Sequence, residues 1–297
     1  MKNLIRKLIP FSFLERYRAY KKRRLNQKLI DDQKKGNIIT KADLIKDLHS
    51  NGIQNGDTLL VHSSLSKIGY VENGAKDVVE ALLDVVGEQG NLLMPNSPNA
   101  KFQIDYIKEL DFFDVENAVS KLGSISEYFR KLPTAQRSAH PTEPVSCIGP
   151  DSEYFIGHHF GNQTPYNENS PFYRVSEKGG KILYLGVTFD NAGTNLHTIE
   201  DAIENFKYPV YYPEDFEVNV LFPNGTLRKM TTKVHNPEQS KKRKCDGLIP
   251  LLEKREALKK ITIGNAPSLL VDAKLFFNVL IEEYHKNGVT MYTPNGE

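Results

Sequence analysis

The sequence predicts an α/β fold in which buried strands alternate with helices, and three observations support this. Short apolar runs suited to buried strands recur at residues 58–61, 91–94, 145–148 and 181–187. Segments with helical periodicity lie between and after these runs. The chain has 297 residues, of which 39% are hydrophobic and 26% charged, enough for one large core. We therefore expect one domain over residues 40–297.

Residues 1–39 differ in charge from the rest of the chain and are expected to form a basic N-terminal extension. Residues 1–40 carry 12 Lys and Arg against 3 Asp and Glu, whereas the remainder carries 27 against 34. Lys21-Lys22-Arg23-Arg24 is the densest basic run. Three interpretations stay open: a helix docked on the domain, a helix on an anionic membrane surface, or a solvated arm.

The first elements of the domain form a βαβ unit. Thr40 precedes Leu44 and Leu48 at helical spacing, which is typical of an N-capped amphipathic helix. A strand at 58–61, a helix at 75–86 and a strand at 91–94 ending at Pro95 then follow in order. This order predicts two parallel strands joined by a crossover helix.

Later segments continue the alternation. Helices are predicted at 124–132, 194–205 and 272–286, and strands at 145–148 and 181–187. Between 216 and 235 the pattern alternates around Pro223-Asn224-Gly225, which indicates a hairpin.

Composition excludes several classes of protein. No apolar run approaches the roughly 18–20 residues that a membrane-spanning helix needs, and the N-terminus lacks the features of a secretory signal. Cys147 and Cys245 are far apart without a CxxC spacing, and His158 and His159 are adjacent, so we predict neither a disulfide framework nor a metal site. A cytoplasmic location with reduced thiols is expected.

The segment 61–75 leads from a strand through a Ser- and Gly-rich loop to a helix. Such a loop presents backbone N–H groups and hydroxyls at a helix N-terminus, where a pyrophosphate is favoured. It matches neither GxGxxG nor a P-loop, and Gly69 and Gly74 alone are a weak signal. Spacing by itself favours a structural turn over a ligand loop.

Three blocks nevertheless resemble the aminoglycoside 3-N-acetyltransferase family, in family order. They are Leu59-Leu60-Val61-His62-Ser63-Ser64-Leu65 with Ile68-Gly69-Tyr70-Val71 and Gly74-Ala75, then Arg137-Ser138-Ala139-His140-Pro141-Thr142 with Ile148-Gly149-Pro150, and finally Gly180-Lys181-Ile182-Leu183-Tyr184-Leu185-Gly186-Val187 with Thr194-Asn195-Leu196-His197-Thr198-Ile199-Glu200. The similarity spans roughly residues 40–290.

The resemblance implies a mixed central sheet flanked by helices and an acyl-CoA-dependent N-acyltransferase with acetyl-CoA, or another acyl-CoA, as cosubstrate. It places coenzyme A along six small or apolar residues and one arginine: Ser63, Ser64, Leu65, Gly69, Gly74, Ser138 and Arg137. An arginine at a phosphate also has a physical reason, because its guanidinium binds oxygens bidentately.

Departures from the family pattern fall mainly on the acceptor side. Gly193-Thr194 stands where Asn-Thr is usual, Asn96 replaces a frequent Thr after Met94-Pro95, and the acidic residue after the hairpin has no clear counterpart near His235. We assign Asn96, Thr194 and His235 to acceptor binding.

His197 is the predicted general base. It lies in the first turn of the helix after strand 181–187, where the helix dipole would keep the imidazole neutral and able to take the amine proton. The alternative from the residues alone is a histidine that only fills the helix start. Glu200, one turn along, is expected to orient the imidazole or contact a cationic acceptor, or to be a surface partner, and Asp190 is a second acidic candidate.

Two functions from different classes remain. The first is acyl transfer to an amino sugar, either an aminoglycoside or a nucleotide-linked sugar of surface-polysaccharide synthesis. The second is a non-catalytic protein that binds nucleic acid or anionic lipid through the basic segments 21–24 and 241–244. If the chain is an acyltransferase, we expect no nucleic-acid partner, and a peripheral membrane contact through residues 1–39 is an option. The oligomeric state stays open, and a dimer is one option.

Overall fold

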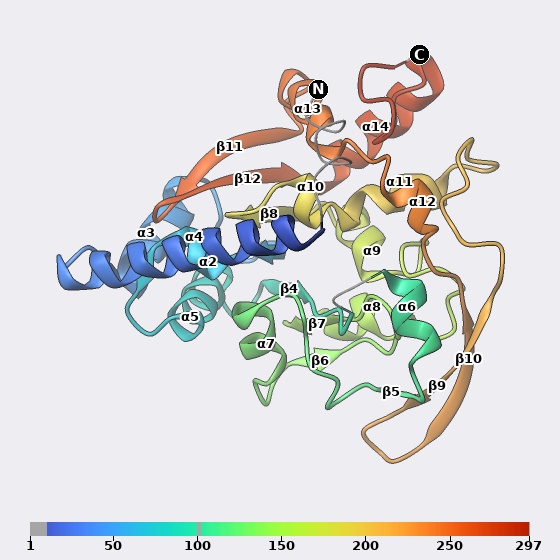
Figure 1. The fold of residues 1–297 in the computed structure, drawn as a ribbon, viewed down its shortest axis with the longest axis horizontal. Coiled ribbons are helices and arrows are strands. Elements are labelled where there is room, and N and C mark those ends of the chain that lie inside the picture. Colours follow the sequence, from blue (N-terminus) through green and yellow to red (C-terminus); the bar gives the residue numbers. More distant parts are fainter. Residues whose placement is uncertain (1–10, 100–101, 297) are drawn as a thin grey trace.

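A computed structural model describes residues 11–99 and 102–296, and its centre is a seven-stranded mixed sheet (Figure 1). The strand order is β11-β12-β8-β2-β4-β7-β6. The pairs β8–β2 and β2–β4 are parallel, and all the other neighbours are antiparallel. The strands are β2 (Thr58–Ser63), β4 (Asn91–Pro95), β6 (Gln136–Arg137), β7 (Val145–Ile148), β8 (Lys181–Leu185), β11 (Leu258–Ile263) and β12 (Ala266–Asp272). The predicted mixed α/β sheet is confirmed.

Helices cover both faces of this sheet. Successive strand residues point to opposite sides, so each face carries apolar side chains that need covering. Leu59 and Val61 of β2 join one hydrophobic cluster, while Leu60 between them joins the other. The first cluster includes α3 (Lys41–Ser50), α5 (Ala75–Val86) and α7 (Ser124–Arg130). The second includes α8 (Ser152–Ile156), α9 (Pro171–Glu177), α11 (His197–Ala202), α13 (Ile249–Lys254) and α14 (Ala273–Asn287).

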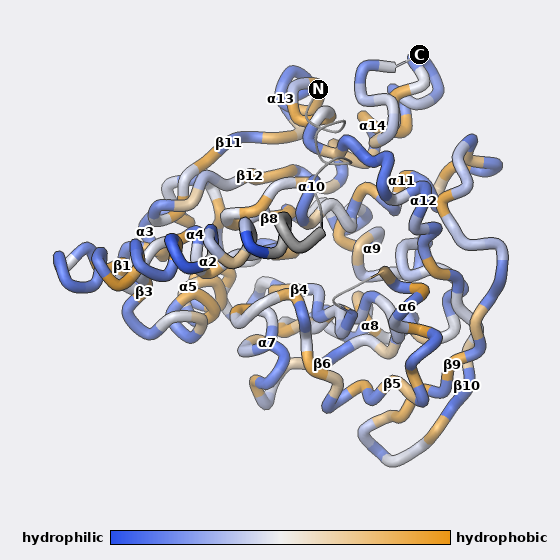
Figure 2. The backbone as a smooth tube through the Cα atoms, viewed as in Figure 1, coloured by the Kyte–Doolittle hydropathy of each residue, from blue (hydrophilic) through white to orange (hydrophobic). Residues whose placement is uncertain are grey.

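The βαβ unit forms as the sequence predicts. Thr40 and Asp43 make a reciprocal capping box at the start of α3. Helix α5 then carries the chain from β2 to β4, which pair in parallel from Thr58 opposite Asn91. Figure 2 shows hydrophobic residues concentrated in the central strands and the helices that cover them, whereas many outer loops are hydrophilic.

A second sheet contains the predicted hairpin. Strands β9 (Phe216–Leu221) and β10 (Leu227–Thr232) pair antiparallel around the turn, and β5 (Phe113–Asp114) adds in parallel to β9. The other short helices are α6 (Gln103–Lys108), α10 (Phe189–Ala192), α12 (Pro237–Ser240) and the 3₁₀ turns η1 (Thr194–Leu196) and η2 (Cys245–Leu248).

The basic extension is largely helical. Helix α2 (Phe11–Lys34) packs against the short helix α4 (Leu65–Ile68) and strand β3 (Tyr70–Val71). Strand β1 (Ile38–Ile39) pairs in parallel with β3, which ties the residues just before Thr40 to the domain. The part of the extension at residues 1–10 lies outside the described residues. Among the described residues, no helix combines the length and apolar character needed to cross a membrane.

Two predicted elements have different bounds in the structure. The strand at 181–187 stops at Leu185, because Gly186 has a φ of +71° that redirects the chain. The helix predicted from residue 194 begins with the 3₁₀ turn η1 and becomes α-helical only at His197, ending at Ala202. Both changes occur where the chain enters the candidate site.

Candidate active site

Two adjoining clefts lie where β2, β4 and β8 end. In open α/β sheets such carboxyl ends of parallel strands are where ligands collect. The serine cleft, whose lining includes Ser63 and Ser64, has a volume of about 340 Å³. The histidine cleft, whose lining includes His197 and His235, has a volume of about 700 Å³. Five residues line both clefts and therefore form their junction: Asn99, Glu143, Asn191, Ala192 and Thr194.

His197 lies in the wall of the histidine cleft, at the start of α11. The residue is 4% exposed, and its Nδ1 hydrogen-bonds the Oε2 of Glu200 one helical turn later. When Glu200 is ionised, Nδ1 must carry the proton of this bond, which leaves Nε2 free to accept one. The rings of Tyr166 and His235 pack beside the imidazole, with centroids 4.8 and 4.1 Å away.

Burial keeps the His197 imidazole neutral. Desolvation lowers the pKa of His197 well below its usual 6.5, and the nearby positive charge of Arg243 lowers it further. From the sequence we attributed the neutral state of His197 to the dipole of its helix, but α11 has only six residues and follows a 3₁₀ turn. Burial and Arg243 therefore replace the dipole as the physical cause.

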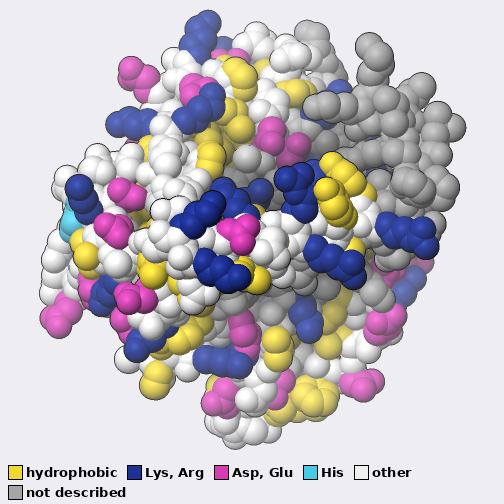
Figure 3. Space-filling view, turned by 60° about the vertical axis from the view of Figure 1, so that its left-hand side comes forward, with side chains coloured by type: hydrophobic (Ala, Val, Ile, Leu, Met, Phe, Trp, Pro, Cys, Tyr) yellow, Lys and Arg dark blue, Asp and Glu magenta, His cyan; other side chains and the backbone are white. Residues whose placement is uncertain are grey.

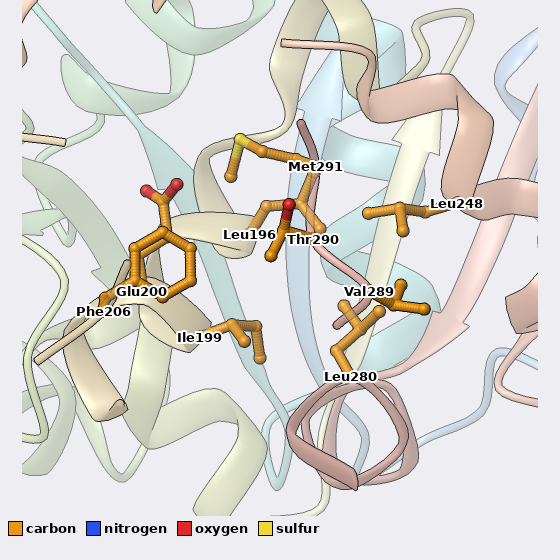
Figure 4. A pocket seen from close by; sticks show the side chains of 9 residues that line it. All are labelled: Leu196, Ile199, Glu200, Phe206, Leu248, Leu280, Val289, Thr290 and Met291. Atoms are coloured by element: carbon orange, nitrogen blue, oxygen red, sulfur yellow. The ribbon is translucent and has the colours of Figure 1, made fainter. Parts of the chain in front are cut away.

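Glu200 is a buried carboxylate with one oxygen in use. It is 5% exposed, and its Oε1 makes no hydrogen bond of normal geometry among the described residues, although the Tyr292 hydroxyl lies close enough to favour the ionised carboxyl. Its carboxyl group also borders a small apolar pocket of about 20 Å³, shared with side chains that include Leu196, Phe206 and Met291 (Figure 4). This apolar surrounding explains why burial raises the pKa of Glu200 to about 7.

The other two predicted side chains at this site differ in their surroundings. His235 is 8% exposed, its backbone N–H donates to Gln103 at 2.9 Å, and its Nε2 is buried without a partner among the described residues. Asp190 lines the same cleft, but its carboxylate accepts from the backbone N–H of Asp246 at 3.1 Å. Glu200, and not Asp190, is therefore the carboxylate bound to His197.

His62 and Glu143 line the clefts although the sequence did not assign them to the site. His62 Nε2 lies 3.1 Å from Asn195 Oδ1 and 3.3 Å from the hydroxyl of Thr194, and burial lowers the pKa of His62 to about 4. Glu143 accepts from Gln103 at 2.9 Å at the junction of the clefts, and burial raises its pKa to about 7. The only signal for Glu143 was its position next to the segment 137–142.

Three of the buried groups are also close enough to share a metal ion. One ligand atom each from His197, Glu200 and His235 lies within 4.8 Å of the others. Sequence spacing could not reveal this cluster, because His235 comes from a distant segment. The positive charge of Arg243 acts on all three groups, however, and opposes a divalent cation there.

The family model for aminoglycoside 3-N-acetyltransferases matches residues 60–284, about three quarters of the chain. The chain belongs to the aminoglycoside 3-N-acetyltransferase family. Aminoglycoside N(3)-acetyltransferase VIII of Streptomyces fradiae is 30% identical over 185 residues, which cover 58% of this chain and 64% of that relative. The match thus spans just under two thirds of that relative's length.

Two solved structures of aminoglycoside acetyltransferases share the fold. AAC-VIa bound to sisomicin is 26% identical, with a TM-score of 0.68, and the match covers 82% of this chain and 96% of that one. The binary complex of AAC-IIIb with CoASH is 24% identical, with a TM-score of 0.69, and the match covers 84% and 97%. At 24% identity, the match to AAC-IIIb is evidence for a shared fold alone.

The residues that the family resemblance assigns to coenzyme A are distributed unevenly. Ser63 and Ser64 line the serine cleft. Gly69 instead packs against Asn265 and Ile39, since a Cβ there would lie 2.7 Å from both side chains. These two serines are the part of the predicted loop that faces the serine cleft.

The next two loop residues flank the start of helix α5. Leu65 packs against the hydrophobic cluster under α5, and a Cβ on Gly74 would meet only Leu65, at 3.8 Å. Asp77 accepts hydrogen bonds from Asn73 in the first turn of α5, so a carboxylate already supplies the negative charge that this helix end favours.

Arg137, Ser138 and Asn96 are engaged inside the protein. The guanidinium of Arg137 donates to the backbone carbonyls of Val115, Ala118 and Asn96. The Ser138 hydroxyl bonds His159 Nδ1 at 2.8 Å. Asn96 is 0% exposed, and its amide donates to Ser126. Each of these polar groups already has a hydrogen-bond partner within the protein. Their roles in ligand binding therefore stay predictions.

Proposed function

We propose that this chain transfers an acetyl or other short acyl group from acyl-CoA to an amino group of an amino sugar, with His197 as the general base. The observation that carries the proposal is the buried His197–Glu200 pair, with His197 in the wall of the histidine cleft that adjoins the serine cleft, in a member of an acetyltransferase family. The serine cleft would hold the acyl-CoA arm, and the histidine cleft would hold the acceptor.

The geometry supports a direct transfer. The lone pair of the acceptor amine attacks the thioester carbonyl carbon, and its proton moves to Nε2 of His197. The C–S bond then breaks, and the coenzyme A thiolate leaves with that proton, so the products are an amide and a free thiol. Glu200, bound to Nδ1, stabilises the positive charge that forms on the imidazole.

Release of coenzyme A thiol is the direct test. The protein should release thiol from acetyl-CoA only when an amino-sugar acceptor is added, and acetyl-CoA should raise its thermal midpoint. A sisomicin-bound relative and the family name favour aminoglycosides as the first acceptors to try, with sugar nucleotides beside them. A folded protein that releases no thiol with any of them, and shows no thermal shift, would contradict the proposal.

The non-catalytic alternative has less support. It rested on two basic segments, 21–24 and 241–244, as surfaces for nucleic acid or anionic lipid. Arg243, however, lines the histidine cleft, and its field acts on the buried His197 and His235. Part of the segment 241–244 therefore belongs to the candidate site.

A peripheral membrane contact through α2 is a separate part of the proposal. Figure 3 shows Lys and Arg side chains gathered across the middle of the face that carries α2. Exposed basic residues of this helix are accompanied by exposed Tyr17 and Tyr20, over whose rings Lys21 and Arg24 lie at 4.7 and 6.0 Å. Each basic residue near an anionic surface contributes about 1 kcal/mol.

Vesicle sedimentation tests this contact. The protein should bind vesicles rich in phosphatidylserine and lose that binding when Lys21, Arg23 and Arg24 are replaced by Gln. The matched control replaces three exposed cations elsewhere, Lys254, Lys259 and Lys260, and should bind as the wild type does. Equal binding by both variants would locate the contact away from α2.

A further inference from the structure

We propose that Glu143 is a second proton acceptor of the site, which binds the ammonium form of the acceptor and takes its first proton before the amine attacks. The inference rests on the proposed acyl transfer and concerns the junction of the two clefts. An alkylamine is protonated at neutral pH and then has no lone pair for the thioester carbonyl. Two protons must therefore leave the nitrogen in each transfer, and His197 accounts for only one of them.

Glu143 lies at the junction of the two clefts. Among the five residues that line both clefts, Glu143 is the one with a titratable side chain, and the other four are Asn99, Asn191, Ala192 and Thr194. With acyl-CoA in the serine cleft and the acceptor in the histidine cleft, the thioester and the amine come together beside this junction. A carboxylate in that position can contact the acceptor nitrogen directly.

Two hydrogen bonds in series hold the carboxyl group of Glu143 in place. Gln103 uses its side-chain oxygen to accept the backbone N–H of His235 at 2.9 Å, so the amide nitrogen of Gln103 is the atom that faces Glu143. That nitrogen donates to Oε1 of Glu143, also at 2.9 Å. Glu143 is 7% exposed and lines both clefts. Because a carboxylate accepts several hydrogen bonds, an ammonium group can donate to it while the bond to Gln103 remains.

The surroundings of Glu143 suit a group that binds a proton and releases it again. Burial raises the pKa of Glu143 to about 7. The hydrogen bond from Gln103, the Asn99 amide and the positive charge of Arg243 act in the opposite direction and favour the ionised form. A base with a pKa near the working pH is ionised often enough to accept a proton and protonated readily enough to assist the reaction.

Glu143 and His197 then divide the two protons. The ionised carboxylate of Glu143 receives one proton from the acceptor ammonium, which leaves a neutral amine and a protonated carboxyl group. The amine nitrogen bonds to the thioester carbon as His197 takes the second proton and passes it to the departing coenzyme A sulfur. Glu143 returns its proton to water after the product leaves. The net reaction converts an ammonium and an acyl-CoA into an amide, a free thiol and one proton in solution.

A second interpretation is that Glu143 only ties helix α6 to the segment that follows Pro141. Its bond to Gln103 does join these two parts of the chain. In that case replacing Glu143 would lower stability and would affect every acceptor equally. A proton acceptor matters instead for acceptors that arrive as ammonium ions.

The test compares two forms of one acceptor that differ in the protonation of the nitrogen. Sisomicin is used first, then other amino sugars, each beside a derivative with an alkoxyamine at the acylated position, whose nitrogen is largely neutral at neutral pH. Glu143→Gln keeps the side-chain length and an oxygen that can accept from Gln103. With acetyl-CoA, this variant should lower kcat/KM by about tenfold or more for the amine and by no more than about twofold for the alkoxyamine.

Two further variants control this comparison. Glu143→Asp keeps a carboxylate on a shorter side chain, so its kcat/KM for the amine should lie between those of the wild type and Glu143→Gln. Glu88→Gln makes the same chemical change on an exposed residue after α5 and should behave as the wild type with both forms. The ratio of the two kcat/KM values does not depend on the folded fraction of a preparation, so partial unfolding of a variant does not imitate the effect.

The outcomes separate the inference from the proposed function. No thiol release from the wild type with any acceptor contradicts the proposed acyl transfer itself. If transfer occurs and Glu143→Gln slows both forms of the acceptor equally, or slows neither, the inference is wrong while acyl transfer stands. A loss confined to the ammonium form supports Glu143 as the acceptor of the first proton.

Discussion

The serine cleft and the histidine cleft share a wall but differ in chemistry. Hydroxyls and apolar side chains dominate the first, including Ser63, Ser64 and Val187, whereas the second carries His197, His235 and several charged groups. The serine cleft is built mainly from strand ends and the loops that follow them. The histidine cleft collects residues from segments as distant as 99 and 246. One therefore suits recognition by shape, and the other suits proton transfer and charge selection.

The largest expected effect in this comparison is at His197. His197→Ala should lower kcat by about a hundredfold or more, because a positioned general base contributes that much, while acetyl-CoA binding in the serine cleft stays near normal. Steady-state kinetics and acetyl-CoA titration measure the two quantities. A folded variant with near wild-type turnover would mean that the imidazole only packs at the start of α11.

The pH dependence should report Glu200. Its pKa of about 7 means that kcat falls as the pH drops through this value, because the protonated carboxyl no longer stabilises an imidazolium. Glu200→Gln should lose this inflection and lower kcat by about tenfold or more. A profile that is identical in the variant would assign the titration to another group.

Stability should change in the opposite direction at the same residue. The raised pKa of Glu200 means that the folded protein holds this proton more tightly than the unfolded chain, so its contribution to stability is lost as the pH rises through about 7. A neutral Gln avoids this loss. The thermal midpoint of Glu200→Gln relative to wild type should therefore be higher at about pH 8 than at about pH 5.5.

A smaller and more selective effect is expected in the serine cleft. Ser63→Leu narrows the cleft beside β2, so the apparent KM for acyl-CoA should rise by about tenfold while the acceptor KM changes little. Ser50→Leu, on exposed α3, provides a matched control for the added apolar surface. A rise in the acceptor KM alone would mean that the serine cleft holds the acceptor and the histidine cleft holds the acyl-CoA.

The smallest effect is expected from removing the basic helix. A chain that starts at Gly36 should keep kcat and both KM values within about twofold, because α2 contacts α4 and β3 outside the two clefts. A chain that starts at Thr40 also loses the pairing of Ile38 and Ile39 with β3 and should melt at a lower temperature. Loss of turnover in the chain that starts at Gly36 would mean that α2 contributes to the site.

Much of the fold was predictable because its signals are local. Strand and helix periods located β2, α5, β4 and β7, and the cap at Thr40 and the Pro223-Asn224-Gly225 turn marked boundaries correctly. The ends of β8 and α11 were predicted less well, since a 3₁₀ turn and a glycine with positive φ leave little trace in the periodicity. The candidate site lies at these irregular ends.

The sequence by itself determined the α/β alternation and the family resemblance. It offered Glu200 as one of two acidic candidates beside His197, since residues three apart in a helix lie on one face, and the structure shows the bond between them. Only the tertiary structure decided which charged side chains line a cleft. Arg137 was expected at a ligand but donates to backbone carbonyls, whereas Arg243 stood in an apparently solvated basic run and lines the histidine cleft. Whether a charged group already has a partner depends on neighbours brought together by packing, and spacing along the chain does not contain that information.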